Sequence, residues 1–160
     1  MDKNMSTKIL TNRLQIRLST DTEMKNMIEN EKDLGLKQAY SQMLKASLKN
    51  PDSRQWFATW IIELNDVEQT KVGDLSFKGL KEDGSVEIGF GFNEAYWNKG
   101  YATEAVEAIV NWALNQPGVK IVEAEAESNN IASIRVLEKN NFVSTGLIGE
   151  EGPRFIYKQD

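Results

Sequence analysis

Residues 97–105 read Trp97-Asn98-Lys99-Gly100-Tyr101-Ala102-Thr103-Glu104-Ala105, between a predicted strand over residues 86–92 and a predicted helix over residues 100–115. Backbone N–H groups in the first turn of a helix lack partners within the helix, and the helix dipole adds partial positive charge there. Gly100 lets another group approach the backbone closely, and Lys99 adds a positive charge. The run therefore predicts an anion site of the kind that holds phosphate.

Gly100 alone leaves a second interpretation open, in which the glycine only permits a tight turn. The run also lacks the Gly-Lys-Ser/Thr ending of the P-loop pattern. It lacks the three spaced glycines that a dinucleotide-binding fingerprint places directly after a strand. The segment therefore matches neither of these two phosphate-binding motifs.

The rest of the chain alternates between strand-like and helix-like hydrophobic patterns. We expect helices capped by Asp21 and Asn130, with Ile131, Ile134 and Leu137 of the latter facing inward. Alternation of strands and helices in the second half implies a parallel or mixed sheet with helices on its faces. The remaining expected elements are helices over residues 33–48 and 100–115 and strands over residues 14–18, 56–64, 72–78, 86–92, 119–126, 143–147 and 154–157.

Composition limits both architecture and chemistry. The chain has 160 residues, of which 40% are apolar and 27% charged, which predicts one globular domain over residues 1–160. No apolar run is long enough for a membrane span, and the first seven residues lack the apolar core of a secretory signal, so we expect a cytoplasmic protein. The formal charge of −5 disfavours a nucleic-acid partner. Without Cys or His, a thiol nucleophile, an imidazole base and a Cys-ligated zinc are excluded.

A second segment, residues 129–142, also opens a helix after a strand; it reads Asn129-Asn130-Ile131-Ala132-Ser133-Ile134-Arg135-Val136-Leu137-Glu138-Lys139-Asn140-Asn141-Phe142. Together the two segments resemble the GNAT superfamily of N-acetyltransferases. The first resembles that family's Gln/Arg-x-x-Gly-x-Gly/Ala loop, and the second its Asn-x-x-Ser helix ending in Gly-Phe. The local amino-acid sequence around the first segment is similar to that of the branch that acetylates ribosomal-protein N-termini. The resemblance covers roughly residues 10–142 and is most specific over residues 86–142.

The resemblance implies an α/β (α+β) fold with a mixed, mostly antiparallel sheet of six to seven strands and helices on both faces. It also implies a splay between the fourth and fifth strands, residues 86–92 and 119–126. Acetyl-coenzyme A would be the co-substrate, with no metal. Its pantetheine arm would lie along Phe90, Gly91 and Phe92 and near Asn130 and Ser133. Its pyrophosphate would be held by the loop residues Trp97, Asn98, Lys99, Gly100, Tyr101, Ala102 and Thr103.

Two departures from the family pattern affect this interpretation. Trp97 stands where many members have Gln or Arg, and Leu137 stands where many members place a Tyr that protonates the leaving thiolate. Asn141 replaces the usual Gly before Phe142, which suits a helix end. A water or another group would therefore supply the proton to the thiolate. Tyr96, Tyr101 and Tyr157 are the alternative donors, against the simpler interpretation that they are packed aromatics.

A carboxylate is the expected base, because an attacking amine must be neutral and the chain has no His. We predict Glu87 on the fourth strand and Glu125 on the fifth, with a raised pKa wherever such a group is buried beside another carboxylate. Glu125 alternates with Glu123 and Glu127, so the three could instead form a solvated face.

The remaining polar and aromatic side chains that stand out have structural interpretations. Glu104, in the first turn of the predicted helix, would interact favourably with the helix dipole. Arg13 and Arg17 are expected to be solvated at the edge of the first strand. The aromatic group Trp56, Phe57 and Trp60 is expected in the core or as a wall of the acceptor pocket.

The leading hypothesis is direct acetyl transfer to a primary amine in a ternary complex, by a monomer or homodimer. The alternatives are a non-catalytic module that binds acyl-coenzyme A as a sensor or scaffold, motivated by the missing Tyr at position 137, and an ordinary structural domain.

Overall fold

A computed structural model describes residues 7–159, so the first six residues, on which part of the signal-peptide expectation rests, lie outside it. The helices are α1 (Asp21–Asn30), α2 (Leu34–Lys49), α3 (Tyr101–Leu114) and α4 (Ile131–Lys139), with short 3-10 turns at Pro51–Trp56 and Glu94–Tyr96. The strands are β1 (Lys8–Leu10), β2 (Leu14–Leu18), β3 (Trp60–Leu64), β4 (Lys71–Leu80), β5 (Ser85–Phe92), β6 (Ile121–Glu125), β7 (Phe142–Ile148) and β8 (Pro153–Tyr157).

The strands form one sheet in the order β1-β2-β3-β4-β5-β6-β8-β7. All neighbours are antiparallel except β5 and β6, which run parallel. The mixed, mostly antiparallel sheet is therefore confirmed, although it has eight strands rather than six to seven. The additional strand, β1, has three residues, too few for a hydrophobic alternation to reveal it.

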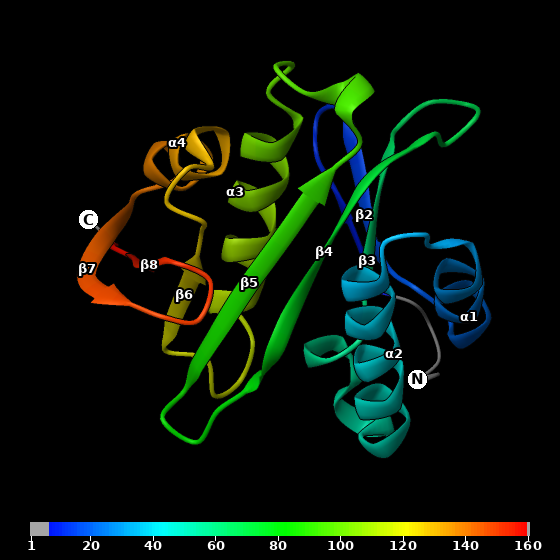
Figure 1. The fold of residues 1–160 in the computed structure, drawn as a ribbon, viewed down its shortest axis with the longest axis horizontal. Coiled ribbons are helices and arrows are strands. Elements are labelled where there is room, and N and C mark those ends of the chain that lie inside the picture. Colours follow the sequence, from blue (N-terminus) through cyan, green and yellow to red (C-terminus); the bar gives the residue numbers. More distant parts are fainter. Residues whose placement is uncertain (1–6, 160) are drawn as a thin grey trace.

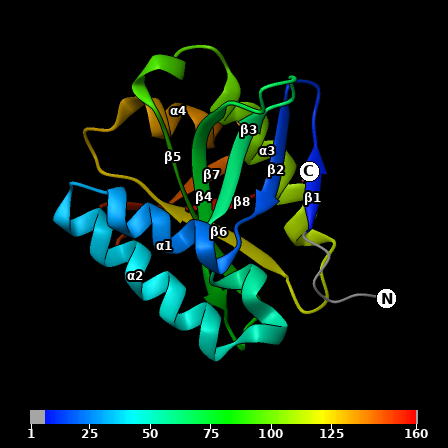
Figure 2. The same ribbon diagram turned by 90° about the vertical axis from the view of Figure 1, so that its right-hand side faces the viewer.

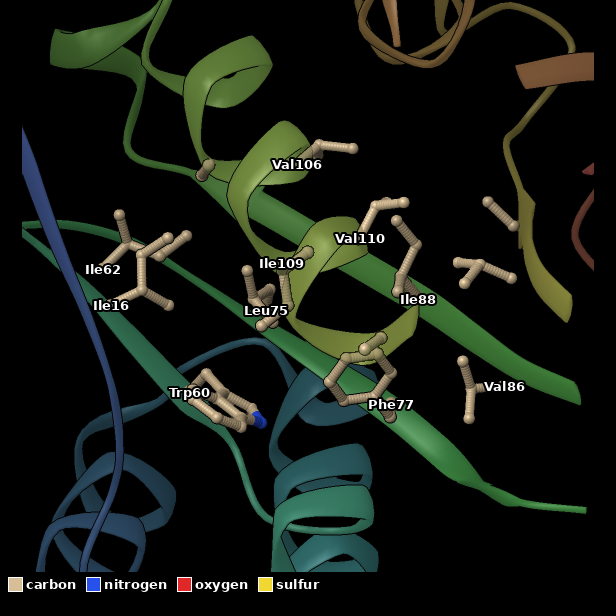
Figure 3. Close-up of a cluster of buried hydrophobic side chains, with 14 of the residues drawn as sticks. Ile16, Trp60, Ile62, Leu75, Phe77, Val86, Ile88, Val106, Ile109 and Val110 are labelled. Carbon is tan, nitrogen blue, oxygen red and sulfur yellow. The ribbon is translucent and has the colours of Figure 1, made fainter. Parts of the chain in front are cut away.

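Helices cover both faces of the sheet, as predicted: α3 and α4 lie on one face, and α1 and α2 on the other (Figures 1 and 2). The main core lies between the sheet and α3. Val106 and Ile109 of α3 face Leu75, Phe77 and Ile88 (Figure 3). Trp56 and Trp60 pack against Trp112 of α3 with ring centroids 5.3 and 4.9 Å apart, and Phe57 packs against the same cluster, so the core interpretation of this aromatic group is confirmed.

Two details of the helix predictions are wrong. The N-cap of α1 is Thr20, whose side chain accepts from the Glu23 N–H in a reciprocal capping box, and Asp21 is the first helical residue. Ile131 is 56% exposed, because the first turn of α4 borders an open cavity rather than the core. Asn130 is the N-cap of α4, as predicted. Asn141 takes the left-handed conformation, with φ 66°, at the other end.

The two arginines expected at solvated strand edges are paired instead. Arg17 on β2 binds Glu23 of α1 and Glu63 of β3, at 2.8 and 3.0 Å. Arg13 binds Glu104 of α3 at 2.7 Å. Arg17 is not at an edge because β1 takes the sheet edge and β2 is an interior strand, while Arg13 lies just before β2 and stays 41% exposed in its ion pair. Within residues 7–159, none of the helices combines the length and apolar character that crossing a bilayer requires.

Candidate active site

An opening separates the ends of the two parallel strands. β5 pairs with β6 only from Ser85↔Ile121 to Ile88↔Ala124, and β5 then continues to Phe92 while β6 stops at Glu125. Figure 1 shows β5 extending beyond β6 toward the start of α3. A cavity of about 220 Å³ lies at this splay. Its lining residues are Gly89, Phe90, Glu125, Ala126, Glu127, Asn130, Ser133 and Glu151.

Three residues that the sequence assigned to one ligand therefore meet at one cavity: Phe90, Asn130 and Ser133. Asn130 accepts the Ser133 N–H through its side-chain oxygen at 3.1 Å, which leaves the amide nitrogen to donate elsewhere. Strand β5 also has open space beside its two glycines near the cavity. A Cβ atom added at Gly89 or Gly91 would meet no other atom within 4 Å.

The loop before α3 is tied to the end of β5. The Trp97 indole N–H donates to the Phe92 carbonyl at 2.7 Å, so that carbonyl is occupied and the open backbone of β5 is that of Phe90. Gly100 is the N-cap of α3 with φ 82°, and no side chain caps the helix there. The first-turn N–H groups of α3, from Tyr101 to Thr103, are therefore available to an anion.

Arg13 holds this loop from the neighbouring hairpin, which the sequence did not reveal. Its guanidinium donates to the Lys99 carbonyl at 2.9 Å, pairs with Glu104, and lies 4.5 Å from the centre of the Tyr101 ring. Burial raises the pKa of Glu104, but hydrogen bonds from Thr11 and Arg13 outweigh burial and lower it overall. Glu104 thus fastens the start of α3 to the β1–β2 hairpin, beyond any effect on the helix dipole.

The predicted bases are both bound to one arginine, Arg154 of β8. Its guanidinium donates to Glu87 at 3.1 Å and also to Glu123 and Glu125. Lys78 of β4 pairs with Glu87 at 2.7 Å. Burial raises the pKa of Glu87, but Lys78 and Arg154 outweigh it, so the pKa is lowered and the expected rise is wrong for this residue.

The glutamate row is not a simple solvated face. The Glu125 side chain is 6% exposed and accepts the Glu151 N–H at 3.1 Å, while Glu123 binds Arg154. Glu127 is exposed and lies beyond the end of β6. Of the two predicted bases, Glu125 lines the cavity and Glu87 does not.

No tyrosine is among the residues that line this cavity. Leu137, at the position where many family members have Tyr, is fully buried in the core. Tyr157 packs on Phe142, and Tyr96 packs near Tyr101. The packed-aromatic interpretation therefore describes the three candidate tyrosines better than that of a proton donor at the splay.

Residues 11–143 match the acetyltransferase (GNAT) domain. The chain belongs to the GNAT acetyltransferase family. Similar curated proteins include the uncharacterized N-acetyltransferase YjdG of Bacillus subtilis (strain 168), 39% identical over 88 residues, which are 54% of this chain and 52% of YjdG. The uncharacterized N-acetyltransferase p20 of Bacillus licheniformis is 32% identical over 78 residues, 48% of this chain and 44% of p20. The chain thus spans about half the length of these curated relatives.

Solved structures share the GNAT fold over nearly the whole chain. The ribosomal L7/L12 alpha-N-protein acetyltransferase RimL in complex with coenzyme A has a TM-score of 0.73 at 14% identity, covering 94% of this chain and 96% of that one. A GNAT-family acetyltransferase from Bacillus anthracis has a TM-score of 0.68 at 24% identity, covering 94% and 96%. The aminoglycoside acetyltransferase AAC(6')-Ib with coenzyme A has a TM-score of 0.66 at 20% identity, covering 91% and 95%. At these identities the similarity establishes the fold.

Proposed function

We propose that this GNAT domain is an acetyl-coenzyme A-dependent N-acetyltransferase that acts on a primary amine of a small molecule, peptide or protein. One observation carries the proposal: the splay between β5 and β6 is followed along the chain by the uncapped start of α3, and the hydrogen bond from the Trp97 indole to the Phe92 carbonyl ties the intervening loop to the end of β5. An extended thiol arm that ends in a pyrophosphate matches an open strand edge followed by a helix N-terminus.

The residues present fit coenzyme A. The backbone N–H and C=O of Phe90 face away from β4 and are open, because β6 has already ended, whereas those of Gly91 face β4. Asn130 can donate its amide nitrogen to the pantetheine arm, with Ser133 nearby. The pyrophosphate would bind the N–H groups at the start of α3, with Lys99 adding charge. When bound, acetyl-coenzyme A supplies an activated thioester at the splay.

Acetyl transfer requires a neutral amine nitrogen to attack the thioester carbonyl carbon. The carbon–nitrogen bond forms, the carbon–sulfur bond breaks, and the amine loses a proton. We assign that proton to Glu125 or to a water that Glu125 holds, because Glu125 lines the cavity. Glu87 remains the second proposed carboxylate; it does not line the cavity, and Lys78 and Arg154 lower its pKa, which weakens it as a base. The departing thiolate takes a proton from water, since Leu137 has none to give.

The test is thiol release from acetyl-coenzyme A, followed spectrophotometrically with a panel of amines. The RimL and AAC(6')-Ib similarities motivate including a peptide with a free α-amino group and an aminoglycoside beside polyamines and amino acids. We expect release that depends on the amine, and loss of turnover but not of coenzyme A binding in Glu125→Gln. Release no faster than hydrolysis with every amine would refute the proposal.

A non-catalytic sensor of acyl-coenzyme A is the second candidate, because an apolar, fully buried Leu137 replaces the usual proton donor. A thermal shift with coenzyme A, together with no amine-dependent thiol release, would favour it. Saturation at 100-fold over Kd should add about 2.7 kcal/mol of stability. A cytoplasmic location, a monomer or homodimer, and the absence of nucleic-acid and membrane partners stay predictions.

A further inference from the structure

A strip of open space runs along β5 on the face of the sheet that carries α2. In the antiparallel pairing of β4 with β5, Asp74 is opposite Gly91 and Ser76 is opposite Gly89. Residues directly opposite each other in such a pair project to the same face. Because neither glycine has a side chain and a Cβ there would meet nothing within 4 Å, Asp74 and Ser76 border the open strip.

Asp74 is held in place by a residue from α2. The buried Tyr40 hydroxyl donates to Asp74 Oδ2 at 2.8 Å, and Lys71 Nζ lies 3.8 Å from the same oxygen. Both contacts are to Oδ2, so Oδ1 can accept from another donor. The Asp74 side chain is 23% exposed, which leaves it accessible from the strip.

The surroundings of Asp74 do not fully compensate its charge. Burial raises the pKa of this carboxyl, Tyr40 and Lys71 offset only part of the rise, and Glu31 adds to it. A partly buried carboxylate whose charge is not fully compensated destabilises the fold, and such groups are found at functional sites rather than in stable cores. A cation bound at Oδ1 would supply the missing compensation.

We propose that Asp74, positioned by Tyr40, binds a cationic group of the acceptor over Gly89 and Gly91, so that the acceptor is a primary amine that carries a second positive charge. This inference rests on the proposed function, which places the thioester along Phe90 and Gly91. Opposite residues of an antiparallel pair have Cα atoms about 5 Å apart, so a cation on Asp74 lies next to that segment. The attacked nitrogen must be neutral, and the group held by Asp74 is therefore the other amine.

The experiment compares putrescine, a diamine, with n-butylamine, which has one amino group and the same four-carbon chain. Asp74→Asn should raise the KM for putrescine about 10- to 100-fold, because a charge-assisted hydrogen bond is lost. The KM for n-butylamine should change less than about twofold. Tyr40→Phe should raise the putrescine KM by a smaller factor. Asp52→Asn, at an exposed carboxylate outside this strip, is the matched control and should change neither value.

Folding and coenzyme A binding are measured on the same proteins. Asp74→Asn should be at least as stable as the parent at pH 7, because it removes a charge that burial disfavours. Its thermal shift with coenzyme A should equal that of the parent.

If the parent neither binds coenzyme A nor releases thiol, the proposed function fails and this inference falls with it. If the parent acetylates amines but Asp74→Asn alters both KM values equally, or neither, the inference alone is overturned.

Discussion

Replacing Arg154 by Met should destabilise the protein by about 3 kcal/mol at pH 7, since breaking a buried ion pair on one side costs roughly 3–5 kcal/mol. Arg154 binds Glu87, Glu123 and Glu125, and the side chains of Glu87 and Glu125 are only 8% and 6% exposed. The lower end of the range applies because Lys78 stays paired with Glu87 and Arg154 itself is 20% exposed. Methionine keeps the apolar stem, so the loss is one of charge and hydrogen bonds.

The stability difference between the parent and Arg154→Met should depend on pH. In the parent, the lowered pKa of Glu87 contributes stability above its ordinary pKa, and this contribution disappears as the pH falls. Without Arg154, only Lys78 offsets the burial of Glu87, so the pKa of Glu87 should rise and the variant should lose less stability than the parent as the pH falls. The difference between the two proteins should therefore be largest at pH 7 and shrink toward pH 4.

Urea unfolding at both pH values measures this difference, with Arg135→Met on the exposed surface of α4 as the matched control. Adding Glu125→Gln to Arg154→Met should recover about 1 kcal/mol, because it removes one unpaired charge. A variant within about 0.5 kcal/mol of the parent at pH 7, or a deficit that does not change with pH, would show that the arginine does not stabilise the carboxylates.

Three other substitutions test separate parts of the structure. Gly100→Ala should lower the free energy of unfolding by about 1 kcal/mol in thermal melts and weaken coenzyme A binding in calorimetry, because φ is 82° at this position. Gly35→Ala, within α2, is the control and should not lower stability. Equal behaviour of the two variants would contradict the argument. Glu23→Gln should destabilise the protein by about 1 kcal/mol at pH 7, because hydrogen bonds from Arg17 lower the pKa of Glu23 to about 2. In urea unfolding at pH 3 the difference in stability between variant and parent should be smaller, because the parent loses the stabilisation from ionised Glu23 as the pH falls from 4.5 toward 2. Leu137→Tyr should destabilise by about 2 kcal/mol without raising kcat, whereas faster thiol release would place this position at the thiolate after all.

Local patterns in the sequence were sufficient to locate the proposed binding site for the acetyl donor. Gly100 and Asn130 act within a few residues of themselves, as a left-handed N-cap and as a side-chain cap. Such caps and the hydrophobic periodicity of the following helices depend on short spacings, which a sequence displays directly. The same reasoning missed β1, because a three-residue strand has no period to detect.

The charge environment of the site depends on contacts between distant segments. Arg154 reaches Glu87 across 67 positions of sequence, and Tyr40 reaches Asp74 across 34. Which side chains meet is decided by the strand order, in which β8 lies beside β6, and by the packing of α2 over β4. The sequence by itself therefore determined which two segments form the proposed coenzyme A site and that carboxylates were available. Only the tertiary structure decided which carboxylate is neutralised by an arginine and which faces open space, because the pKa of a group depends on neighbours that folding brings together.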